Sequence, residues 1–323
     1  MASYHLSATI IGRSDGRSAV AAAAYRSGSI LTNPETGQVH DYTRKGGIVA
    51  SFIVAPQGAP EWATDRAALW PAVHAKETRK NSQLARELIL ALPNELADED
   101  AAALVRAWVT DQCAALGMVG DVAIHDPPPR PDRPRNKHAH VMLTMRPLDA
   151  ATADGWSKTK ARDWNAPETL EAWRETWAEA QNAALERAGA ADRVDHRSLT
   201  EQRAAAVEAG DDLLANLLDR PPEPRLGLVA GIIDRKAGEP VTDRGIALAN
   251  AREGRATLLD AYDRARAAAR TIGAAMRQAT RPVSDLTASL FARPARPPAA
   301  APSIPEPENR TTLDDDDPTP EPR

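Results

Sequence analysis

A layered α+β fold is predicted for this chain of 323 residues, because segments typical of strands alternate with segments typical of helices. Hydrophobic residues make up 42% of the sequence and charged residues 26%, which is ordinary for a globular protein with a core of its own. The single cysteine excludes an internal disulfide. No segment has the length and apolarity of a signal peptide or a membrane span, so we expect a cytoplasmic protein without membrane insertion.

Five segments have the β-branched and apolar character of strands. They cover residues 3–11, 47–56, 84–93, 118–125 and 138–147. A turn at 14–16 follows the first strand, and Pro56 ends the second. Residues 126–137 are rich in proline, which lacks the donor that a sheet needs. This stretch is therefore predicted to be a loop, and the last two strands to form a hairpin across it.

Helical segments follow or separate these strands. They cover residues 19–27, 60–80, 97–116, 167–190, 201–219 and 243–280. The first is rich in alanine, follows Ser18 and ends at Gly28, while Gly117 ends the third. From Arg281 onward prolines and acidic residues dominate, and we expect disorder there.

Three histidines are predicted to meet on one face of the sheet. His138 and His140 are two residues apart in a strand, so their side chains point the same way, and His125 ends the neighbouring strand. Three imidazoles on a metal ion leave coordination positions open, as in catalytic sites. An all-imidazole set favours Zn, Mn, Co or Ni, whereas phosphate oxygens from a bound DNA would also allow Mg or Mn. The alternative is a chance alternation, with each ring making local hydrogen bonds.

Glu87 is a carboxylate in the middle of an otherwise apolar strand. A buried carboxylate needs a partner, and one interpretation is that Glu87 orients a metal-binding histidine through its second ring nitrogen. The alternatives are an exposed position on the strand or an ion pair with Arg86.

Four separate motifs, in this order, resemble the MobA/MobL (MobQ-class) relaxases of mobilisable plasmids. They are YHLSATIIGRSDGRSAVAAAAYRSG, HDYTRKGG, ARELILALP and IHDPPPRPDRPRNKHAHVMLTMR. These relaxases belong to the HUH endonucleases, named for a pair of histidines such as His138 and His140. The resemblance implies a central antiparallel sheet of about five strands, flanked by helices and carrying the metal. It covers about residues 1–200, so we expect a nicking domain there, a helical extension over 201–290 and a disordered Pro-rich, acidic tail over 291–323.

The resemblance also implies the chemistry and the residues of the site. Tyr25 would be the nucleophile, Glu87 would support the metal, and the ligands would be His125, His138 and His140. The implied reaction is a metal-assisted transesterification without ATP, which nicks single-stranded DNA at a transfer origin and leaves a 5′-phosphotyrosine bond. The implied partners are that DNA, accessory mobilisation proteins and the coupling protein of a type IV secretion system.

From the residues alone, Tyr25 has two interpretations. A phenol, with a pKa near ~10, needs a metal, a base or a cationic neighbour to attack at neutral pH, and Arg26 is adjacent. A core aromatic on an alanine-rich helix would look the same.

The net charge of −5 at first argues against a nucleic-acid partner. However, residues 305–323 contain seven acidic and two basic residues, so this stretch accounts for the whole excess. DNA binding would then depend on local patches. The predicted DNA contacts are Arg26, Arg130, Arg133, Arg135 and Lys137 near the proline loop, and Lys158, Lys160 and Arg162 in a second cluster. Solvated side chains without such a role are the alternative.

Three other functions stay open. A rolling-circle replication initiator of the HUH type would use the same chemistry, but its tyrosine follows the histidines, whereas Tyr25 precedes them. A non-catalytic metal-containing DNA-binding protein would not need Tyr25. A hydrolase that uses metal-bound water would leave no protein attached to the DNA.

Overall fold

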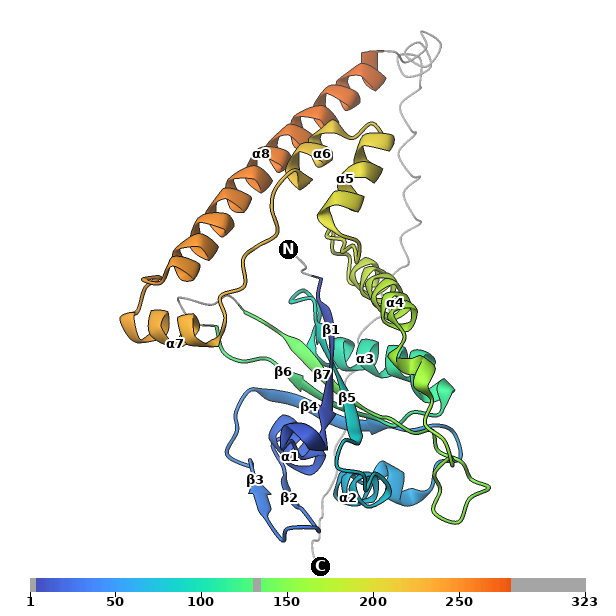
Figure 1. The fold of residues 1–323 in the computed structure, drawn as a ribbon. Coiled ribbons are helices and arrows are strands. Elements are labelled where there is room, and N and C mark those ends of the chain that lie inside the picture. The colour runs from blue at the N-terminus through green and yellow to red at the C-terminus, as the bar shows by residue number, and fades with distance from the viewer. Residues whose placement is uncertain (1–3, 130–134, 280–323) are drawn as a thin grey trace, which may run out of the picture. The chain divides into compact units, whose positions relative to one another are not determined.

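A computed structural model describes residues 4–129 and 135–279, and its centre is a five-stranded antiparallel sheet (Figure 1). The strand order is β1-β5-β7-β6-β4. The strands are β1 (Leu6–Gly12), β4 (Ile48–Val54), β5 (Gln83–Ala91), β6 (Gly120–His125) and β7 (His138–Thr144). The predicted α+β fold with a central antiparallel sheet is confirmed, and so is the hairpin of β6 and β7. A small second sheet, which the sequence did not reveal, pairs β2 (Ile30–Thr32) with β3 (Val39–Asp41).

Eight α-helices and four short 3-10 helices occur in the described residues. The α-helices are α1 (Ala19–Ser27), α2 (Arg66–Lys76), α3 (Asp98–Gln112), α4 (Pro167–Arg187), α5 (Leu199–Glu208), α6 (Asp212–Leu218), α7 (Leu228–Ala237) and α8 (Asp243–Ala279). The 3-10 helices are η1 (Arg13–Asp15), η2 (Glu61–Thr64), η3 (Ala114–Leu116) and η4 (Arg162–Asn165).

Two predicted helices are each divided in two, and one further helix was missed. The single helix expected over 60–80 is η2 followed by α2, because Asp65 adopts an extended conformation and caps α2. The helix expected over 201–219 is divided at Gly210, whose φ of 70° ends α5 before Asp211 caps α6. Helix α7 was not predicted.

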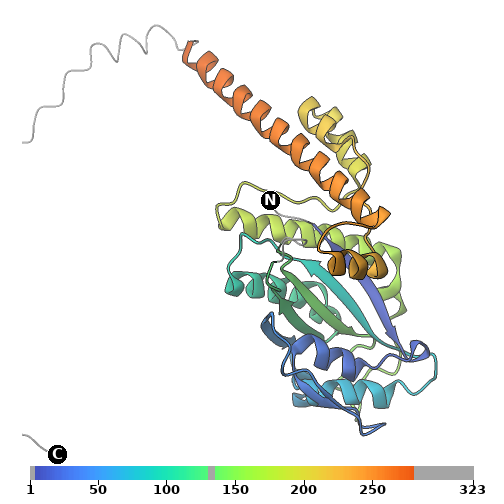
Figure 2. The ribbon, with the colours of Figure 1, turned by 90° about the vertical axis from the view of Figure 1, so that its left-hand side faces the viewer.

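The two faces of the sheet are covered by different helices (Figures 1 and 2). Alternate residues of β5, β6 and β7 point to opposite faces. Leu88, Val122 and Val141 pack in one core cluster with Trp108 of α3 and Trp177 of α4. Ala85 of β5 and Met142 of β7 pack on the other face with Val20 of α1 and Trp70 of α2. Since Met142 shares its face with His138 and His140, the histidines lie on the side of α1 and α2.

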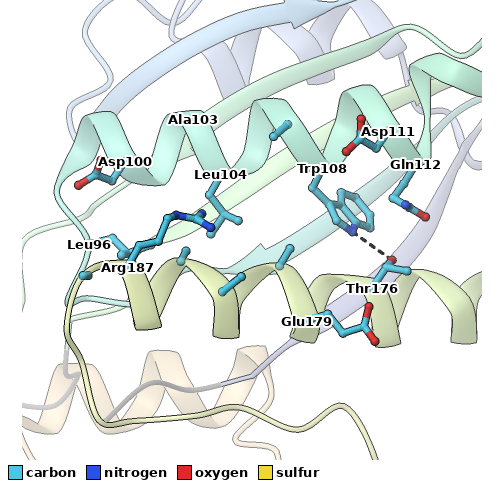
Figure 3. Close-up of a pocket in the computed structure, with 15 residues that line it drawn as sticks. Leu96, Asp100, Ala103, Leu104, Trp108, Asp111, Gln112, Thr176, Glu179 and Arg187 are labelled. Atoms are coloured by element: carbon cyan, nitrogen blue, oxygen red, sulfur yellow. Dashed lines mark hydrogen bonds between the residues drawn. The ribbon is translucent and has the colours of Figure 1, made fainter.

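On the opposite face, α3 and α4 pack side by side with a groove between them (Figure 3). Small side chains line much of it, and Trp108 Nε1 donates a hydrogen bond to Thr176 Oγ1 over 3.2 Å. In Figure 3 this bond links the two helices. These two helices thus form the structural side of the sheet, away from the histidines.

The chain divides into two compact units, residues 1–264 and 265–323, and α8 begins in the first and continues into the second. The expected domain boundaries at 200 and 290 stay predictions, and the expected tail over 291–323 lies outside the described residues. Within 4–129 and 135–279, no helix combines the length and the hydropathy needed to cross a membrane.

Helix α1, which carries Tyr25, is fixed at both ends. At its start, the Ser18 hydroxyl accepts a hydrogen bond from Ala21 N over 3.3 Å, and His74 Nε2 accepts one from Ala19 N over 3.1 Å. At its end, Gly28 adopts a φ of 64°, and a Cβ there would lie only 2.6 Å from Ile48 Cδ1 of β4. The backbone conformation therefore favours glycine at this position, and a Cβ would also force the end of the Ile48 side chain to move.

Replacing Gly28 by alanine tests the role of this glycine at the end of α1. We expect Gly28→Ala to lower the free energy of unfolding by about 2–3 kcal/mol, because the left-handed backbone opposes a methyl group and the Ile48 side chain must move to admit it. Gly37→Ala is the control, since Gly37 has a similar φ of 67° but no neighbouring atom within 4 Å of a Cβ. It should lose only about 1 kcal/mol. Urea unfolding measures both, and equal losses would contradict the close contact with Ile48.

Candidate metal centre and nucleophile

The β6–β7 hairpin brings the three predicted histidines together. Its register pairs His125 with His138 and Ala123 with His140. The ring centroids are 5.3 Å apart for His125 and His138, 4.7 Å for His125 and His140, and 5.0 Å for His138 and His140. One ring nitrogen of each residue lies within 4.8 Å of the others. The spacing read from the sequence thus placed all three imidazoles correctly.

Each of the three rings is oriented by a hydrogen bond through one nitrogen. His140 Nδ1 lies 2.7 Å from Glu87 Oε1, His138 Nδ1 lies 2.7 Å from Asn136 O, and His125 Nε2 lies 2.7 Å from Arg26 O. Since all three partners are oxygen acceptors, the imidazole nitrogens donate. The second nitrogen of each ring then keeps its lone pair, which is what a metal ion needs.

The protonation of the cluster also suits a metal. Burial lowers the pKa of His125 to about 4, and the positive charge of Lys45 acts in the same direction. Burial likewise lowers the pKa of His138. These two imidazoles are therefore neutral at pH 7, in the form that binds metal. Imidazole nitrogens in this arrangement fit a divalent ion and leave other coordination positions open.

Glu87 joins the cluster to helix α1. Its side chain is 6% exposed, and it accepts hydrogen bonds from His140 Nδ1 and from Arg26, whose Nη2 lies 2.5 Å from Glu87 Oε2. Burial raises the pKa of Glu87, but the hydrogen bonds from His140 and Arg26 outweigh it and hold the pKa at about 2. The carboxylate is thus ionised at neutral pH and fixes the ring of His140.

The two alternatives for Glu87 do not fit this geometry. The carboxylate is buried rather than exposed, and its cationic partner is Arg26 rather than Arg86. Arg86 points to the other face of the sheet, where it donates to Asn165 and its guanidinium lies 5.4 Å from the ring centre of Trp173.

Tyr25 lies at the end of α1, immediately before Arg26. Its side chain is 49% exposed, which excludes the alternative of a core aromatic. Its ring meets Tyr42 edge to face, with centroids 5.2 Å apart, and the Lys45 ammonium lies 3.7 Å from its ring centre. Because the Arg26 carbonyl accepts from His125 and the Arg26 side chain donates to Glu87, this end of α1 is anchored at the cluster. Tyr4, by contrast, donates to Arg174 O, and burial raises its pKa.

The described cations near the proline loop are engaged in ion pairs. Arg26 is paired with Glu87, and Arg135 Nε donates to Asp126 Oδ1 over 3.0 Å. Lys137 is 1% exposed, donates to Leu96 O over 3.0 Å and lies 2.6 Å from Asp98 Oδ1. This burial does not allow the phosphate contact expected for Lys137. Arg130 and Arg133 lie outside the described residues.

The second predicted cluster lies at the far end of the sheet. Lys158, Lys160 and Arg162 border a cavity of about 710 Å³ that also involves Gln83, the first residue of β5. The histidines lie at the other end of these strands, and the six steps from His138 to Thr144 along β7 span about 20 Å. The two sites are therefore separate.

Three more cations border this cavity, and the sequence did not reveal them. They are Lys76, Arg79 and Arg146. Glu77 is buried and binds two of the bordering cations, Lys160 Nζ at 2.9 Å and Arg146 Nη2 at 3.1 Å. The cations come from α2, the loop before β5 and the segment after β7. Only the fold brings these cations together. They outnumber the carboxylates that pair with them, Glu77 and Asp154, so the cavity is strongly basic.

Removing the histidine ligands should remove the metal. We expect wild-type protein to retain Mn or Zn after dialysis, and His138→Ala with His140→Ala to retain none by elemental analysis. Glu87→Gln should weaken metal affinity by about 10- to 100-fold, because the ring of His140 loses its carboxylate acceptor. His196→Ala, outside the cluster, is the control. Unchanged metal content in the double variant would contradict this ligand set.

The neutral state of His125 predicts a pH dependence of stability. An unfolded histidine titrates near 6.5, whereas the folded pKa of His125 is about 4. Between these values the unfolded state binds more protons, so the free energy of unfolding falls as pH falls from 7 to 5. In urea unfolding of metal-free protein, His125→Asn should show a smaller fall than wild type. The same fall in both would show that His125 is not the group responsible.

Comparisons with known proteins show what this chain is similar to. Mobilization protein MobL of Acidithiobacillus ferridurans is 35% identical over 267 residues, which cover 74% of this chain and 65% of that protein. Conjugal transfer protein TraA of Agrobacterium fabrum is 34% identical over 267 residues, or 73% of this chain and 22% of that protein. The chain thus spans less than two thirds of the length of both relatives.

A solved structure from work on the molecular basis of vancomycin resistance transfer in Staphylococcus aureus is similar in sequence and in fold. It is 33% identical, with a TM-score of 0.56, and the match covers 61% of this chain and 100% of that chain. The family model for MobA/MobL proteins matches residues 17–210, more than half of the chain, and includes Tyr25, Glu87 and the three histidines. The chain therefore belongs to the MobA/MobL family.

Proposed function

We propose that this protein is a relaxase that nicks one DNA strand at a plasmid transfer origin and stays bonded to the cut end through Tyr25. The observation that carries the proposal is the anchoring of α1 at the histidine cluster. Arg26, the residue after Tyr25, contacts His125 through its carbonyl and Glu87 through its guanidinium. Membership of the MobA/MobL family and the names of the relatives, which concern mobilisation and conjugal transfer, support it.

The proposed reaction is a transesterification at one phosphate. The phenolic oxygen of Tyr25 forms a bond to phosphorus as the bond from phosphorus to the 3′ oxygen breaks. The phenol gives up its proton, and the departing 3′ oxygen takes one up. The ester bond is exchanged rather than hydrolysed, so neither water nor ATP is consumed and the free 3′-hydroxyl can reverse the step.

The histidine cluster would hold the divalent metal for this reaction, with Mg or Mn as the ions in use and Zn, Co or Ni as alternatives by ligand type. When bound, the metal would supply Lewis-acid stabilisation of the charge that develops on the phosphate oxygens. His125, His138 and His140 would be its ligands. Glu87 would keep the ring of His140 in place, and Arg26 would keep Glu87 ionised and hold α1 against the cluster.

The DNA would be held by local basic surfaces rather than by the net charge. The basic cavity around Lys158, Lys160 and Arg162 is open to solvent and lies about 20 Å from the histidines along the strands. It therefore suits backbone phosphates away from the nick. Arg135 would contribute near the metal. The partners of this chain would then be single-stranded DNA at a transfer origin, accessory mobilisation proteins and a type IV secretion coupling protein.

One assay separates this function from the alternatives. A labelled single strand that carries the transfer origin of its own plasmid is incubated with the protein and Mn or Mg, then run on a denaturing gel. We expect a covalent protein–DNA adduct with wild type and with Tyr262→Phe, whose tyrosine lies in α8, and none with Tyr25→Phe, which has no attacking oxygen.

Each other outcome of the gel contradicts the proposal in a different way. An adduct that persists in Tyr25→Phe would mean that another residue is the nucleophile. Cleavage without an adduct, with a free 5′-phosphate, would indicate hydrolysis by metal-bound water. Binding without cleavage would indicate a non-catalytic DNA-binding protein. Cleavage at a replication origin in place of the transfer origin would indicate a replication initiator.

A further inference from the structure

Lys45 makes two contacts with Tyr25 through the same ammonium group. Its Nζ lies 3.7 Å from the centre of the Tyr25 ring, and it donates a hydrogen bond to Tyr25 O over 2.9 Å. One contact holds the backbone at the end of α1 and the other holds the side chain. A single lysine, from a segment 20 residues along the chain, thus fixes the position of the proposed nucleophile.

The turn that carries Lys45 is itself held at the histidine cluster. Lys45 N donates to Tyr42 O over 2.9 Å, and Gly47 O accepts from Asp126 N over 2.8 Å. The next residue, Ile48, begins β4 and pairs with His125 in the sheet. Consistent with this placement, the charge of Lys45 contributes to lowering the pKa of both His125 and His138. The ammonium therefore lies over the Tyr25 ring, on a turn that is joined to the strand end of His125.

Lys45 is also a cation without a charge partner. It is half-buried, and among the described residues no carboxylate forms an ion pair with it. Burial lowers its pKa, and the positive charge of Arg26 adds to this effect. Placing a charge here is unfavourable in the free protein unless an anion arrives or forms nearby. Two anions would do so in the proposed reaction: the DNA phosphate and the phenolate of Tyr25.

A cation over an aromatic ring distinguishes a phenolate from a phenol. The attraction depends on the negative charge of the ring face, and a phenolate spreads its extra charge over the ring. The ammonium of Lys45 therefore stabilises Tyr25 more when the phenolic proton has left than before. A contact that is stronger in the attacking state than in the resting state speeds the chemical step instead of only improving binding.

We propose that Lys45 is the positioning residue of Tyr25: it holds the ring by a cation–π contact and stabilises the phenolate that attacks the phosphate. This inference rests on the proposed nicking function. It differs from a role as a DNA contact, because Lys45 acts through Tyr25 and changes the rate of attack more than the affinity for DNA. It also requires a positive charge at this place, so a guanidinium should replace the ammonium in part.

Full-length variants separate these roles. The rate of adduct formation is measured in a single turnover at saturating single-stranded DNA, and affinity is measured by fluorescence anisotropy in a Tyr25→Phe background. We expect Lys45→Met, which keeps most of the length of the side chain and removes its charge, to slow adduct formation by about tenfold or more while affinity changes by less than about threefold. Lys45→Arg should recover most of the rate. Arg44→Met, an exposed cation in the same turn, should keep the wild-type rate within about twofold.

Circular dichroism and metal content show whether Lys45→Met is folded, and Lys45→Arg keeps the test informative if it is not. An unchanged rate in Lys45→Met would overturn the inference. So would a loss of affinity as large as the loss of rate, which would make Lys45 a phosphate contact. An equal slowing in Arg44→Met would overturn it too, by assigning the effect to the charge of the turn. If wild type itself formed no adduct, the nicking function would fail instead.

Discussion

The buried carboxylate of Glu87 is the interaction on which the site depends. It lies on β5, and it binds His140 on β7 and Arg26 on α1, so one side chain joins the sheet to the helix that carries Tyr25. Two cationic or proton-donating partners keep it ionised in spite of its burial. Removing Glu87, His140 or Arg26 would leave a buried polar group with a hydrogen bond unmade. This explains why α1 and the histidines hold one relative position.

Because side chains alternate along the strands, the sheet carries a large apolar core on one face and the candidate site on the other. One face of β5, β6 and β7 carries leucine and valine side chains that pack under α3 and α4, with Trp108 and Trp177 as the large anchors. The other face carries Glu87 in the middle of β5, apolar residues such as Ala85 and Met142 beside it, and the histidines at one end. Polar groups can lie there because α1 covers that end and supplies hydrogen-bond partners, Arg26 above all.

Positive charge is arranged around this face in two different ways. At the histidine end, Arg26 and Arg135 are neutralised by carboxylates, and Lys45 is held over an aromatic ring. At the far end, two cations share the buried carboxylate of Glu77, Lys76 pairs with Asp154, and further cations border an open cavity. The first arrangement fixes groups for chemistry, whereas the second leaves charge available to an anionic ligand. Together they would allow the proposed binding of DNA by a chain whose net charge is negative.

The sequence by itself determined what depends on local order: the strands and most helices, the hairpin across the proline loop, and the shared face of His138 and His140, because side chains alternate along a strand. It also predicted Tyr25 as the nucleophile, through motifs in a fixed order. Only the tertiary structure decided the partners, because they come from distant segments. It paired Glu87 with Arg26, buried Lys137 against Asp98, and placed Lys45 over Tyr25. It also placed the Lys158, Lys160 and Arg162 cluster at the far end of the sheet. Contacts of this kind depend on how the helices pack, which no local spacing encodes.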